Sequence, residues 1–346
     1  MDERPLLSIA IPTYNRVDFL SLCLRVLLPQ VRGRTDVEVT VFDNASPDGT
    51  QALAERLRDE QGGFVYRRNA ENIGSDRNIA QCFDEARGVY VWILGDDDVV
   101  LPGALDCILN VIHGAQFGVI FARAYGYDED FMAERPFNFG SDYTIYEDGN
   151  AYIRKVGLMS SFISSIILNK PLLSGMNARQ FAGTSIVQSY LFFHAALRGA
   201  PNVLFHRYLV AAKRDNSGGY SFSQVFGHNY AELMLRLAAD GLTKRTMSAV
   251  NRKSIWLYFP GYVLRLQIRR KPLAELQHAY QDLRALYGGE WLFWVVLVPM
   301  FKLPRALSIL WGCIAVAAGK LANGEFSRVL AYAANRAARA ARRALR

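Results

Sequence analysis

The sequence predicts an α/β fold in which helices flank a Rossmann-like, mostly parallel sheet, followed by a helical extension at the C-terminus. Short apolar runs alternate with amphipathic helical segments over residues 6–127. The connections between these segments are short, which is typical of right-handed βαβ units. The end of the chain is instead basic and, over residues 291–318, strongly apolar. These observations together predict the fold class.

The expected elements follow one another closely along the chain. Strands are expected at residues 6–11, 37–42, 64–68, 90–95 and 118–127, and strand-like runs follow at 162–169 and 202–214. Helices are expected after a cap at Asn15, over 51–59, from a cap at Ser75 to a stop at Gly88, after Pro102, and over 185–199. Weak periodicity between 128 and 160 predicts a long, partly irregular insertion.

Composition and charge exclude several classes of protein. With 51% hydrophobic and 21% charged residues, the 346-residue chain is folded rather than disordered. Its four cysteines are scattered, which argues against zinc and disulfides and fits a reducing compartment. Residues 1–244 carry a net charge of −5 and residues 245–346 a net charge of +13. This asymmetry predicts a polyanionic surface as the partner of the basic end.

Polar side chains follow four of the expected strands, at the point where each strand ends. They are Thr13 to Asn15, Asp43 with Asn44, Asn72 to Arg77, and Asp96 to Asp98. Ligands of open α/β sheets bind at the carboxyl ends of the strands. The four groups therefore predict one ligand site at this edge of the sheet.

The three consecutive aspartates at 96–98 have three possible explanations. Carboxylates ahead of Pro102 can favour a helix N-terminus, but this accounts for one aspartate. A calcium loop needs further oxygen ligands and a glycine at set spacing, which are absent. A divalent cation that bridges a phosphorylated ligand relieves the repulsion among the aspartates with few protein ligands. Taken alone, the cluster favours the cation and the structural role about equally.

The residues at the other strand ends also have two possible interpretations each. Asp43 can accept a hydrogen bond from the edge of a nucleobase, or it can belong to a turn with Asn44. Arg77 is either a phosphate contact or a solvated charge. Arg67 and Arg68 are expected on the surface.

Four motifs in order carry a resemblance to a known family. SIAIPTYNR, VFDNASPDGT, NAENIGSDRNIA and WILGDDD resemble the inverting glycosyltransferases of family 2 with the GT-A fold, over about residues 6–105. The resemblance implies a nucleotide-sugar donor and a Mn²⁺ or Mg²⁺ ion held by Asp96 and Asp98, with Asp98 the nearer ligand and Asp96 on the metal or the ribose. It implies that Asp43 reads the base and that Pro12, Thr13 and Tyr14 line its pocket. The donor-binding residues expected in all are Pro12, Thr13, Tyr14, Asn15, Asp43, Asn44, Asn72, Gly74, Arg77, Asp96, Asp97, Lys213 and Arg214.

The general base is where the sequence departs from the family pattern. The expected acidic pair falls on Val187 and Gln188, and a glutamine amide does not act as a base. Either another carboxylate replaces it, or the mechanism departs from simple inversion, or the chain is catalytically impaired; the candidates are Asp128, Glu129, Asp130 and Asp142. Gln188 itself can bind acceptor or donor sugar, and a glutamine on this helix is similar to abequosyltransferase-type enzymes of O-antigen assembly. His194 is expected to be packed rather than catalytic.

A basic loop and the apolar end complete the expectations. Lys213 or Arg214 can clamp the diphosphate or belong to a solvated loop. The runs 291–301 and 306–318 are each too short for a membrane span, so shallow insertion is expected, aided by Trp291, Trp294 and Trp311. The arginines from Arg328 to Arg346 are expected to attract anionic lipid, whereas nucleic acid is not expected as a partner.

Three regions and a location follow from the resemblance and the apolar end. Residues 1–105 are expected to form the nucleotide-sugar-binding half, 106–225 the acceptor-binding half, and 226–346 a membrane-associating region. The predicted function is transfer of a sugar to a polyprenyl-diphosphate-linked glycan at the cytoplasmic face of the bacterial inner membrane, as a peripheral, monotopic protein. The N-terminus carries no signal-peptide pattern. The alternatives are a sugar-nucleotide nucleotidyltransferase and a catalytically silent scaffold that binds glycan or nucleotide.

Overall fold

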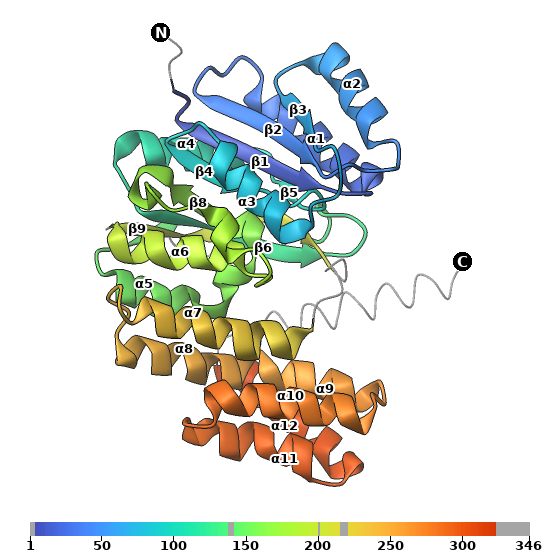
Figure 1. Ribbon diagram of the computed structural model, residues 1–346, viewed down its shortest axis with the longest axis vertical. Helices are drawn as coiled ribbons and strands as arrows, with labels where there is room; N and C mark the ends of the chain where they lie inside the picture. The colour runs from blue at the N-terminus through green and yellow to red at the C-terminus, as the bar shows by residue number, and fades with distance from the viewer. Residues whose placement is uncertain (1–3, 138–141, 200, 215–220, 323–346) are drawn as a thin grey trace. The chain divides into compact units, whose positions relative to one another are not determined.

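The computed structural model describes residues 4–137, 142–199, 201–214 and 221–322. Within them the chain forms two compact units (Figure 1). The first comprises Met1–Tyr220 with Glu232–Thr246, and the second Ser221–Ala231 with Met247–Arg346. The predicted region boundaries at residues 105 and 225 stay predictions. The expected lipid contacts of Arg328 to Arg346 lie outside the described residues.

A nine-stranded sheet forms the centre of the first unit in the described part of the chain. Its order is β3-β2-β1-β4-β8-β6-β9-β5, with β7 also paired to β9. The strands are β1 Leu7–Thr13, β2 Val37–Asp43, β3 Val65–Arg68, β4 Tyr90–Ile93, β5 Val99–Val100, β6 Val119–Tyr127, β7 Tyr143–Tyr146, β8 Ile166–Asn169 and β9 Asn202–Lys213. The pairings among β3, β2, β1 and β4 are parallel, as the βαβ pattern predicts. The sheet as a whole is mixed, because β8 runs antiparallel to both β4 and β6.

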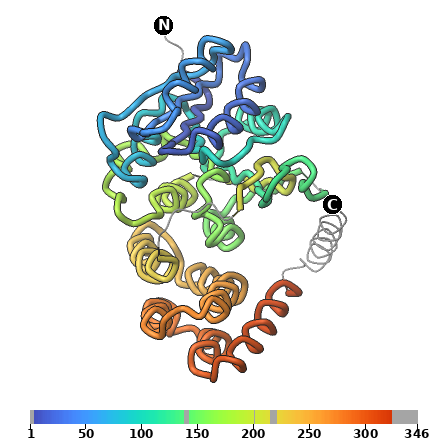
Figure 2. Tube along the Cα trace, turned by 90° about the vertical axis from the view of Figure 1, so that its right-hand side faces the viewer, coloured from blue at the N-terminus to red at the C-terminus, as the bar shows by residue number. Residues whose placement is uncertain are grey.

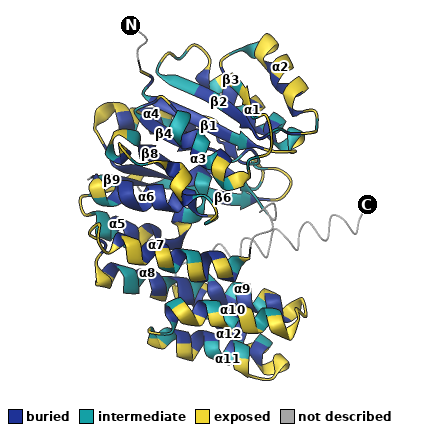
Figure 3. Cartoon of the chain, in the orientation of Figure 1, coloured by how far each residue is buried: buried dark blue, intermediate teal, exposed yellow. Residues whose placement is uncertain are grey.

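Helices cover both faces of this sheet. Alternate side chains of β1, β2 and β4 share one apolar core with α1 (Val17–Val31), α2 (Thr50–Gln61) and α4 (Ala104–Gly114). On the other face, α3 (Ser75–Glu85) contacts β1 and β4, and α6 (Val187–Arg198) contacts β8 (Figure 1). The central strands are buried and α2 exposes one side (Figure 3). Burial on both faces explains why β1 and β4 read as continuous apolar runs.

The predicted helix caps at Asn15 and Ser75 are wrong. Helix α1 begins at Val17, whose N–H donates to Asp48 Oδ2 at 3.0 Å, so a carboxylate of the β2–α2 loop caps it. Asn15 has a positive φ of 55° and donates its own N–H to Ser46 Oγ. Helix α3 has Gly74 as its N-cap, at a φ of 88° that favours glycine. At α1 the capping carboxylate comes from Asp48, which is distant in sequence. At α3 the N-cap is Gly74, one residue before the predicted Ser75.

The segment between residues 128 and 160 is more regular than expected. It contains β7 and helix α5 (Gly149–Val156), which Asp148 caps by accepting the N–H groups of Asn150 and Ala151 at 2.9 and 3.1 Å. Four short 3-10 helices, Gly157–Ser161, Ile163–Ser165, Lys170–Leu173 and Ala178–Phe181, flank β8. Strand β5 (Val99–Val100) lies outside the expected strands. It is two residues long, and its pairing with β9 is visible only in the folded chain.

The rest of the chain is helical where it is described (Figures 1 and 2). The elements are Gln224–Asn229, α7 Tyr230–Leu237, α8 Lys244–Leu257, α9 Phe259–Ile268, α10 Leu273–Tyr287, Phe293–Leu297, α11 Val298–Lys302 and α12 Arg305–Ala322. Within the second unit an aromatic core forms around Phe259, whose ring lies 4.7 Å from that of Tyr287. The Tyr287 hydroxyl donates to the Phe226 carbonyl at 2.8 Å, which satisfies a polar group inside this core.

Helix α12 is apolar on both sides, but its two sides differ in residue size. Its 18 residues have a mean hydropathy of 1.4, and in the described part of the chain it is the one helix long and apolar enough to cross a membrane. The buried positions are the small residues Ser308, Gly312, Ala315 and Gly319. A Cβ on Gly319 would lie 2.6 Å from the Trp256 carbonyl oxygen, so the helix packs closely inside the second unit. Its large apolar side chains therefore point outward.

Candidate active site

Asp98 lies at the carboxyl end of β4, where two other strands bring donors to it. Antiparallel β8 begins beside the end of β4, so Ser164, just before β8, donates its hydroxyl to Asp98 Oδ2 at 2.5 Å. The same hydroxyl accepts the Gly95 N–H at 2.8 Å. Asp98 Oδ1 accepts the N–H of Lys213, the last residue of β9. The Asp98 side chain is thus fixed and buried, and the hydrogen bonds to it come from neutral groups.

Asp96 is buried next to Asp98 and is held from β1. Its Oδ2 accepts the Thr13 hydroxyl at 2.7 Å, and its Oδ1 lies 3.1 Å from the Arg16 guanidinium. Arg16 also reaches Asp97 at 3.3 Å, so one cation contacts two of the three carboxylates. The pairing offsets part of the repulsion within the cluster.

The electrostatic cost of this cluster appears in its pKa values. Burial raises the pKa of Asp96 to about 6, although Thr13 and Arg16 oppose the shift. Burial, together with repulsion from Asp97, raises the pKa of Asp98 to about 7, although the Ser164 and Lys213 hydrogen bonds oppose it. Two carboxylates are therefore held where their charged forms are undersolvated, which is a setting that a cation stabilises.

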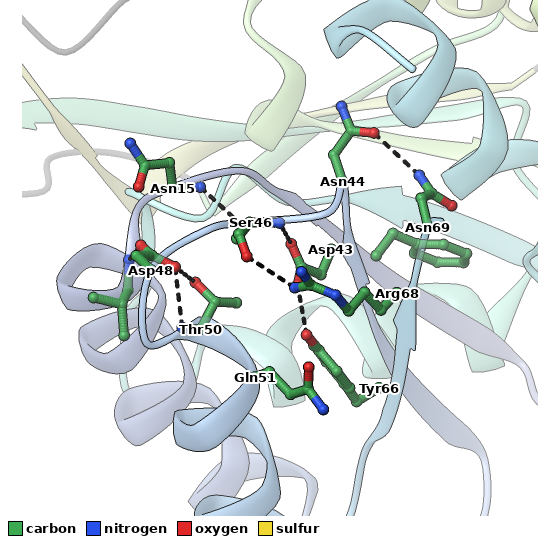
Figure 4. A network of polar contacts seen from close by, with 12 residues as sticks. Asn15, Asp43, Asn44, Ser46, Asp48, Thr50, Gln51, Tyr66, Arg68 and Asn69 are labelled. Atoms are coloured by element: carbon green, nitrogen blue, oxygen red, sulfur yellow. Dashed lines mark hydrogen bonds and ion pairs between the residues drawn. The ribbon is translucent and has the colours of Figure 1, made fainter. Parts of the chain in front are cut away.

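Asp43 forms the centre of a second network, at the end of β2 (Figure 4). It is fully buried, and its Oδ1 accepts the Ser46 N–H at 2.9 Å. Its Oδ2 accepts the Tyr66 hydroxyl at 2.5 Å and the Arg68 guanidinium at 2.7 Å. Arg68 is exposed, as predicted, but β3 pairs in register with β2 and so places its guanidinium beside the buried Asp43. Arg67, on the other side of the strand, pairs with Glu85 as a partly exposed ion pair.

Asparagines connect the ends of β2 and β3. Asn44 Oδ1 accepts the Asn69 amide at 3.1 Å and the Ile73 N–H at 3.0 Å, and its own amide donates to Asn72 Oδ1. Asn72 Oδ1 also accepts the Gly74 N–H, which orders the turn into α3. Asn44 and Asn72 thus hold the loop that frames the edge of the sheet.

The remaining predicted residues of the donor half lie around this edge. Pro12 pairs with Phe42 across β1 and β2, and Tyr14 has 42% of its side chain exposed just beyond β1. Arg77 is exposed on α3. The structure brings Pro12 to Asn15, Asp43 and Asn44 to one strand edge through the parallel register, in which Thr13 lies opposite Asp43.

A basic pair at the end of β9 connects the aspartates to an acidic loop. Arg214 lies 2.9 Å from Asp128 Oδ2 and 3.3 Å from Glu134. Lys213 bonds the Asp128 carbonyl and lies 5.0 Å from the centre of the Tyr127 ring. Glu134 accepts the N–H groups of residues 128, 129 and 130, so it shapes the loop that carries Asp128. A Cβ on Gly126 would meet Arg214 Nε at 2.7 Å, so the glycine makes room for the arginine.

The other candidates for the base lie in different surroundings. Asp130 Oδ1 accepts the N–H groups of Met132 and Ala133, and Glu129 lies in the same exposed loop. Asp142 pairs with Arg207 at 3.6 Å beside the middle of β9. The contacts of Asp128 include both residues of the basic pair, through its backbone carbonyl and its carboxylate.

Helix α6 holds Gln188 and His194 in packed positions. Gln188 is 8% exposed and donates its amide to the Ser161 carbonyl at 2.6 Å. His194 is equally buried and stacks on Phe181 at 6.2 Å between ring centres. Burial lowers the pKa of His194, although Asp240 opposes the shift. His194 is packed, as expected.

The donor set fits a cation shared with a ligand better than one held by the protein alone. No group of three or more His, Cys, Asp or Glu side chains among the described residues is arranged to hold a metal ion. Asp96 and Asp98 nevertheless offer buried carboxylate oxygens, the ligands that Mg²⁺ and Mn²⁺ prefer. Magnesium usually binds one or two carboxylates together with substrate phosphates. The two aspartates therefore fit such an ion.

Sequence reasoning missed several residues of this site, namely Arg16, Tyr66, Arg68, Tyr127, Glu134 and Ser164. Arg16 directly follows Asn15 in PTYNR, so its place in a quoted motif was an available signal. Ser164 and Glu134 had no such signal, because strand pairing and loop closure bring them to the site.

Comparison with known proteins identifies the family. The sequence profile described as "Glycosyl transferase family 2" matches residues 8–165. Abequosyltransferase RfbV of Salmonella typhimurium is 30% identical over 228 residues, which span 61% of this chain and 67% of that protein. The chain belongs to glycosyltransferase family 2.

The chain is also similar to further glycosyltransferases, in sequence or in fold. The GalNAc(5)-diNAcBac-PP-undecaprenol beta-1,3-glucosyltransferase of Campylobacter jejuni is 31% identical over 107 residues, 31% of this chain and 34% of that protein. In fold, the chain is similar to S. aureus TarS 1-349 in complex with UDP-GlcNAc, with a TM-score of 0.63, 16% identity and 92% coverage of both chains. It is also similar to the mannosyltransferase PcManGT of Pyrobaculum calidifontis in complex with GDP-Man and Mn²⁺, with a TM-score of 0.53, 15% identity and coverage of 92% and 87%. The fold is therefore of the GT-A type, with a C-terminal helical region.

The raised pKa of Asp98 predicts that the cation-free enzyme loses stability as the pH rises. An unfolded aspartate has a pKa of about 4, whereas that of folded Asp98 is about 7. The folded state therefore binds more protons between these values, and the free energy of unfolding falls as the pH rises through this window. In EDTA we expect the Tm to fall between about pH 5 and pH 8, by about 2–4 °C for each kcal/mol lost, and to fall less in Asp98→Asn.

The matched control is Asp59→Asn, because that side chain is 79% exposed. It should keep the wild-type dependence of Tm on pH. An Asp98→Asn variant whose Tm falls as steeply as that of the wild type would contradict the assignment.

Proposed function

We propose that this family 2 glycosyltransferase is metal-dependent and transfers a sugar from a nucleotide donor to a lipid-linked glycan in the assembly of a bacterial surface polysaccharide such as O-antigen. One observation carries the metal dependence. Asp96 and Asp98 are buried side by side at the carboxyl edge of the sheet, and Asp98 receives hydrogen bonds from Ser164 and the Lys213 N–H, not from a cation. Such carboxylates are stabilised when a divalent ion and a diphosphate complete the site.

Asp96 and Asp98 would hold Mn²⁺ or Mg²⁺, and the bound ion would neutralise the charge of the diphosphate leaving group. Arg16 neutralises part of the same cluster from the side of β1. Thr13 and Ser164 keep the two carboxylates in fixed rotamers. The chain thereby prepares a rigid, poorly hydrated position for the leaving group before the donor arrives.

The donor would lie along the ends of β1 and β2. Asp43, with one oxygen bonded to a single N–H, has acceptor capacity left for the edge of a nucleobase. Pro12, Thr13 and Tyr14 would line the base pocket, Asn15 would border it, and Asp97 would lie nearer the acceptor. Asn44, Asn72 and Gly74 would shape the loop over the ribose, while Arg77 and the basic pair of Lys213 and Arg214 would bind the diphosphate.

For the acceptor we propose Asp128 as the general base. Its carboxylate is partly exposed and is oriented by Arg214, whereas Asp130 uses one oxygen to cap its own loop. Gln188 would contact a sugar rather than accept a proton. Ser161, whose carbonyl accepts the Gln188 amide, fixes that side chain.

The acceptor and the location follow from the relatives and from the second unit. The named Campylobacter relative acts on an undecaprenol-diphosphate-linked glycan, and we propose the same acceptor class here. Helix α12 exposes Leu307, Leu310 and Ile314, which favours attachment to a lipid surface. Only 22% of the most apolar stretch of α12 is buried, but its buried side is in close contact with α9 and α11. A helix packed in this way fits a peripheral position at the cytoplasmic face of the inner membrane better than a membrane span.

Turnover with a panel of nucleotide sugars and a polyprenyl-diphosphate glycan tests the function. We expect product with Mn²⁺ or Mg²⁺, none in EDTA, and a loss of about 10²-fold or more for Asp98→Ala, since such electrostatic contributions are of that size. Asp59→Ala, on the exposed side of α2, is the control and should keep full turnover. Equal turnover in EDTA would contradict metal dependence, and nucleotide binding without any turnover would favour a silent scaffold.

Asp128→Asn tests the base separately. Loss of general base catalysis predicts a fall in kcat of about 10²–10⁴-fold, with KM nearly unchanged and loss of the acidic limb of the pH–rate profile. Arg214→Gln should raise KM and keep that limb, which separates the base from its ionic partner. Asp130→Asn and Asp142→Asn serve as controls, and full activity of Asp128→Asn would overturn the assignment.

A further inference from the structure

Two turns of the second unit lie side by side and are exposed throughout. One joins α9 to α10 and covers residues 268–273, and the other joins α11 to α12 and covers residues 302–307. Arg305 donates from its guanidinium to the Gln267 carbonyl at 3.1 and 2.9 Å, and it reaches the Ile268 carbonyl at 3.5 Å. Gln267 donates in turn to the Met300 carbonyl at 2.9 Å. We name these two turns together the basic edge.

The basic edge combines apolar tips with positive charge. Ile268 and Leu273 are 56% and 70% exposed in the first turn, and Leu303 and Leu307 are 40% and 50% exposed in the second. The same turns carry the basic residues Arg269, Arg270, Lys271, Lys302 and Arg305. Within the two turns no acidic residue occurs, and the nearest along the chain, Glu275, lies 3.3 Å from Lys271. Exposed leucine and isoleucine side chains thus lie among cations on this surface.

The apolar surface continues from the basic edge along α12. Leu307, Leu310, Ile314 and Leu321 are all at least 50% exposed and recur at three-, four- and seven-residue spacing, so they share one face of α12. The opposite face is made of the small residues that pack inside the unit. An ordinary amphipathic helix of a soluble domain buries its large apolar residues, whereas α12 exposes them.

We infer that the basic edge binds the headgroup region of an anionic bilayer, with Ile268, Leu273 and Leu303 reaching the acyl boundary. This inference rests on the proposed membrane association and adds a site, since residues 268–273 precede the apolar end of the chain and its arginines. Apolar tips flanked by Lys and Arg match the chemistry of a membrane interface. A second copy of the chain fits less well, because self-contact would bring the cations of two such edges together without acidic partners.

Vesicle cosedimentation of the full chain tests the inference, with vesicles of equal parts phosphatidylglycerol and phosphatidylcholine compared with pure phosphatidylcholine. The edge variant carries Arg269→Glu, Arg270→Glu and Lys271→Glu, and we expect its partition into the anionic vesicles to fall at least about tenfold. Arg25→Glu, Arg32→Glu and Arg58→Glu reverse three exposed charges of the first unit as a matched control and should sediment nearly as the wild type does.

The apolar contribution needs its own pair of variants. Ile268→Ser with Leu273→Ser should weaken binding to the anionic vesicles, whereas Leu235→Ser, at a residue 69% exposed on α7, should not. Circular dichroism and turnover on a soluble acceptor analogue show whether each variant is folded and active. Turnover on that analogue does not depend on the basic edge, so a failure of the proposed chemistry is seen separately.

A full-length variant with Arg336, Arg339, Arg342, Arg343 and Arg346 changed to Gln separates the edge from the end of the chain. If this variant still binds the anionic vesicles, and adding the three edge substitutions to it abolishes the binding, the inference is supported. The inference would be overturned if the five glutamines abolish vesicle binding and the edge variant binds as the wild type does. Membrane association itself would then still hold. Absence of wild-type binding, or a dimer in sedimentation velocity that Ile268→Ser with Leu273→Ser dissociates, would also overturn it.

Discussion

The burial of two neighbouring carboxylates at the end of an apolar strand is the constraint on which the rest of the site depends. Asp96 and Asp98 are each 4% exposed, and burial raises the pKa of Asp96 to about 6 and that of Asp98 to about 7. A chain gains no stability from such a pair, so its surroundings must both tolerate and orient it. Thr13, Ser164 and the Lys213 N–H do so with hydrogen bonds. Those groups come from three different strands or strand ends, which ties the geometry of the site to the order of the sheet.

Strand register explains how distant residues meet. In the parallel half, Thr13, Asp43 and Arg68 lie opposite one another at the ends of β1, β2 and β3. In the mixed half, antiparallel β8 starts where β4 ends, and β9 finishes beside β6 at Tyr127. In the proposed function the first arrangement would bind the nucleotide, and the second brings Ser164 and the basic pair, with Asp128 beside it, toward Asp98. The change from parallel to mixed pairing thus joins the two halves of the site.

The parallel half, its helices and the four polar strand ends could be predicted from the sequence, because apolar runs and turn residues there are local signals. In the mixed half, β6, β8 and β9 fall on expected strands, but β5 and β7 could not be predicted, since β5 is two residues long and β7 is defined by its partner β9. Local pattern also misassigned the cap of α1, which Asp48 supplies from another loop, and it gave no sign that the exposed Arg68 pairs with buried Asp43. Thr13 and Asp43, chosen from motifs, lie at the ends of β1 and β2, whereas residues that act through tertiary contact, such as Ser164 and Glu134, had no signal in the sequence.

The central claim is that the two buried aspartates await a divalent ion together with a nucleoside diphosphate. The most direct measurement is the number of protons released when Mn²⁺ and the nucleoside diphosphate bind, obtained by titration calorimetry near neutral pH in buffers of different ionisation enthalpy. With the pKa of Asp98 at about 7, a sizeable fraction of a proton should be released, affinity should rise with pH through this range, and both effects should be lost in Asp98→Asn. Nucleotide binding that is equally strong in EDTA, with no proton released, would contradict the account.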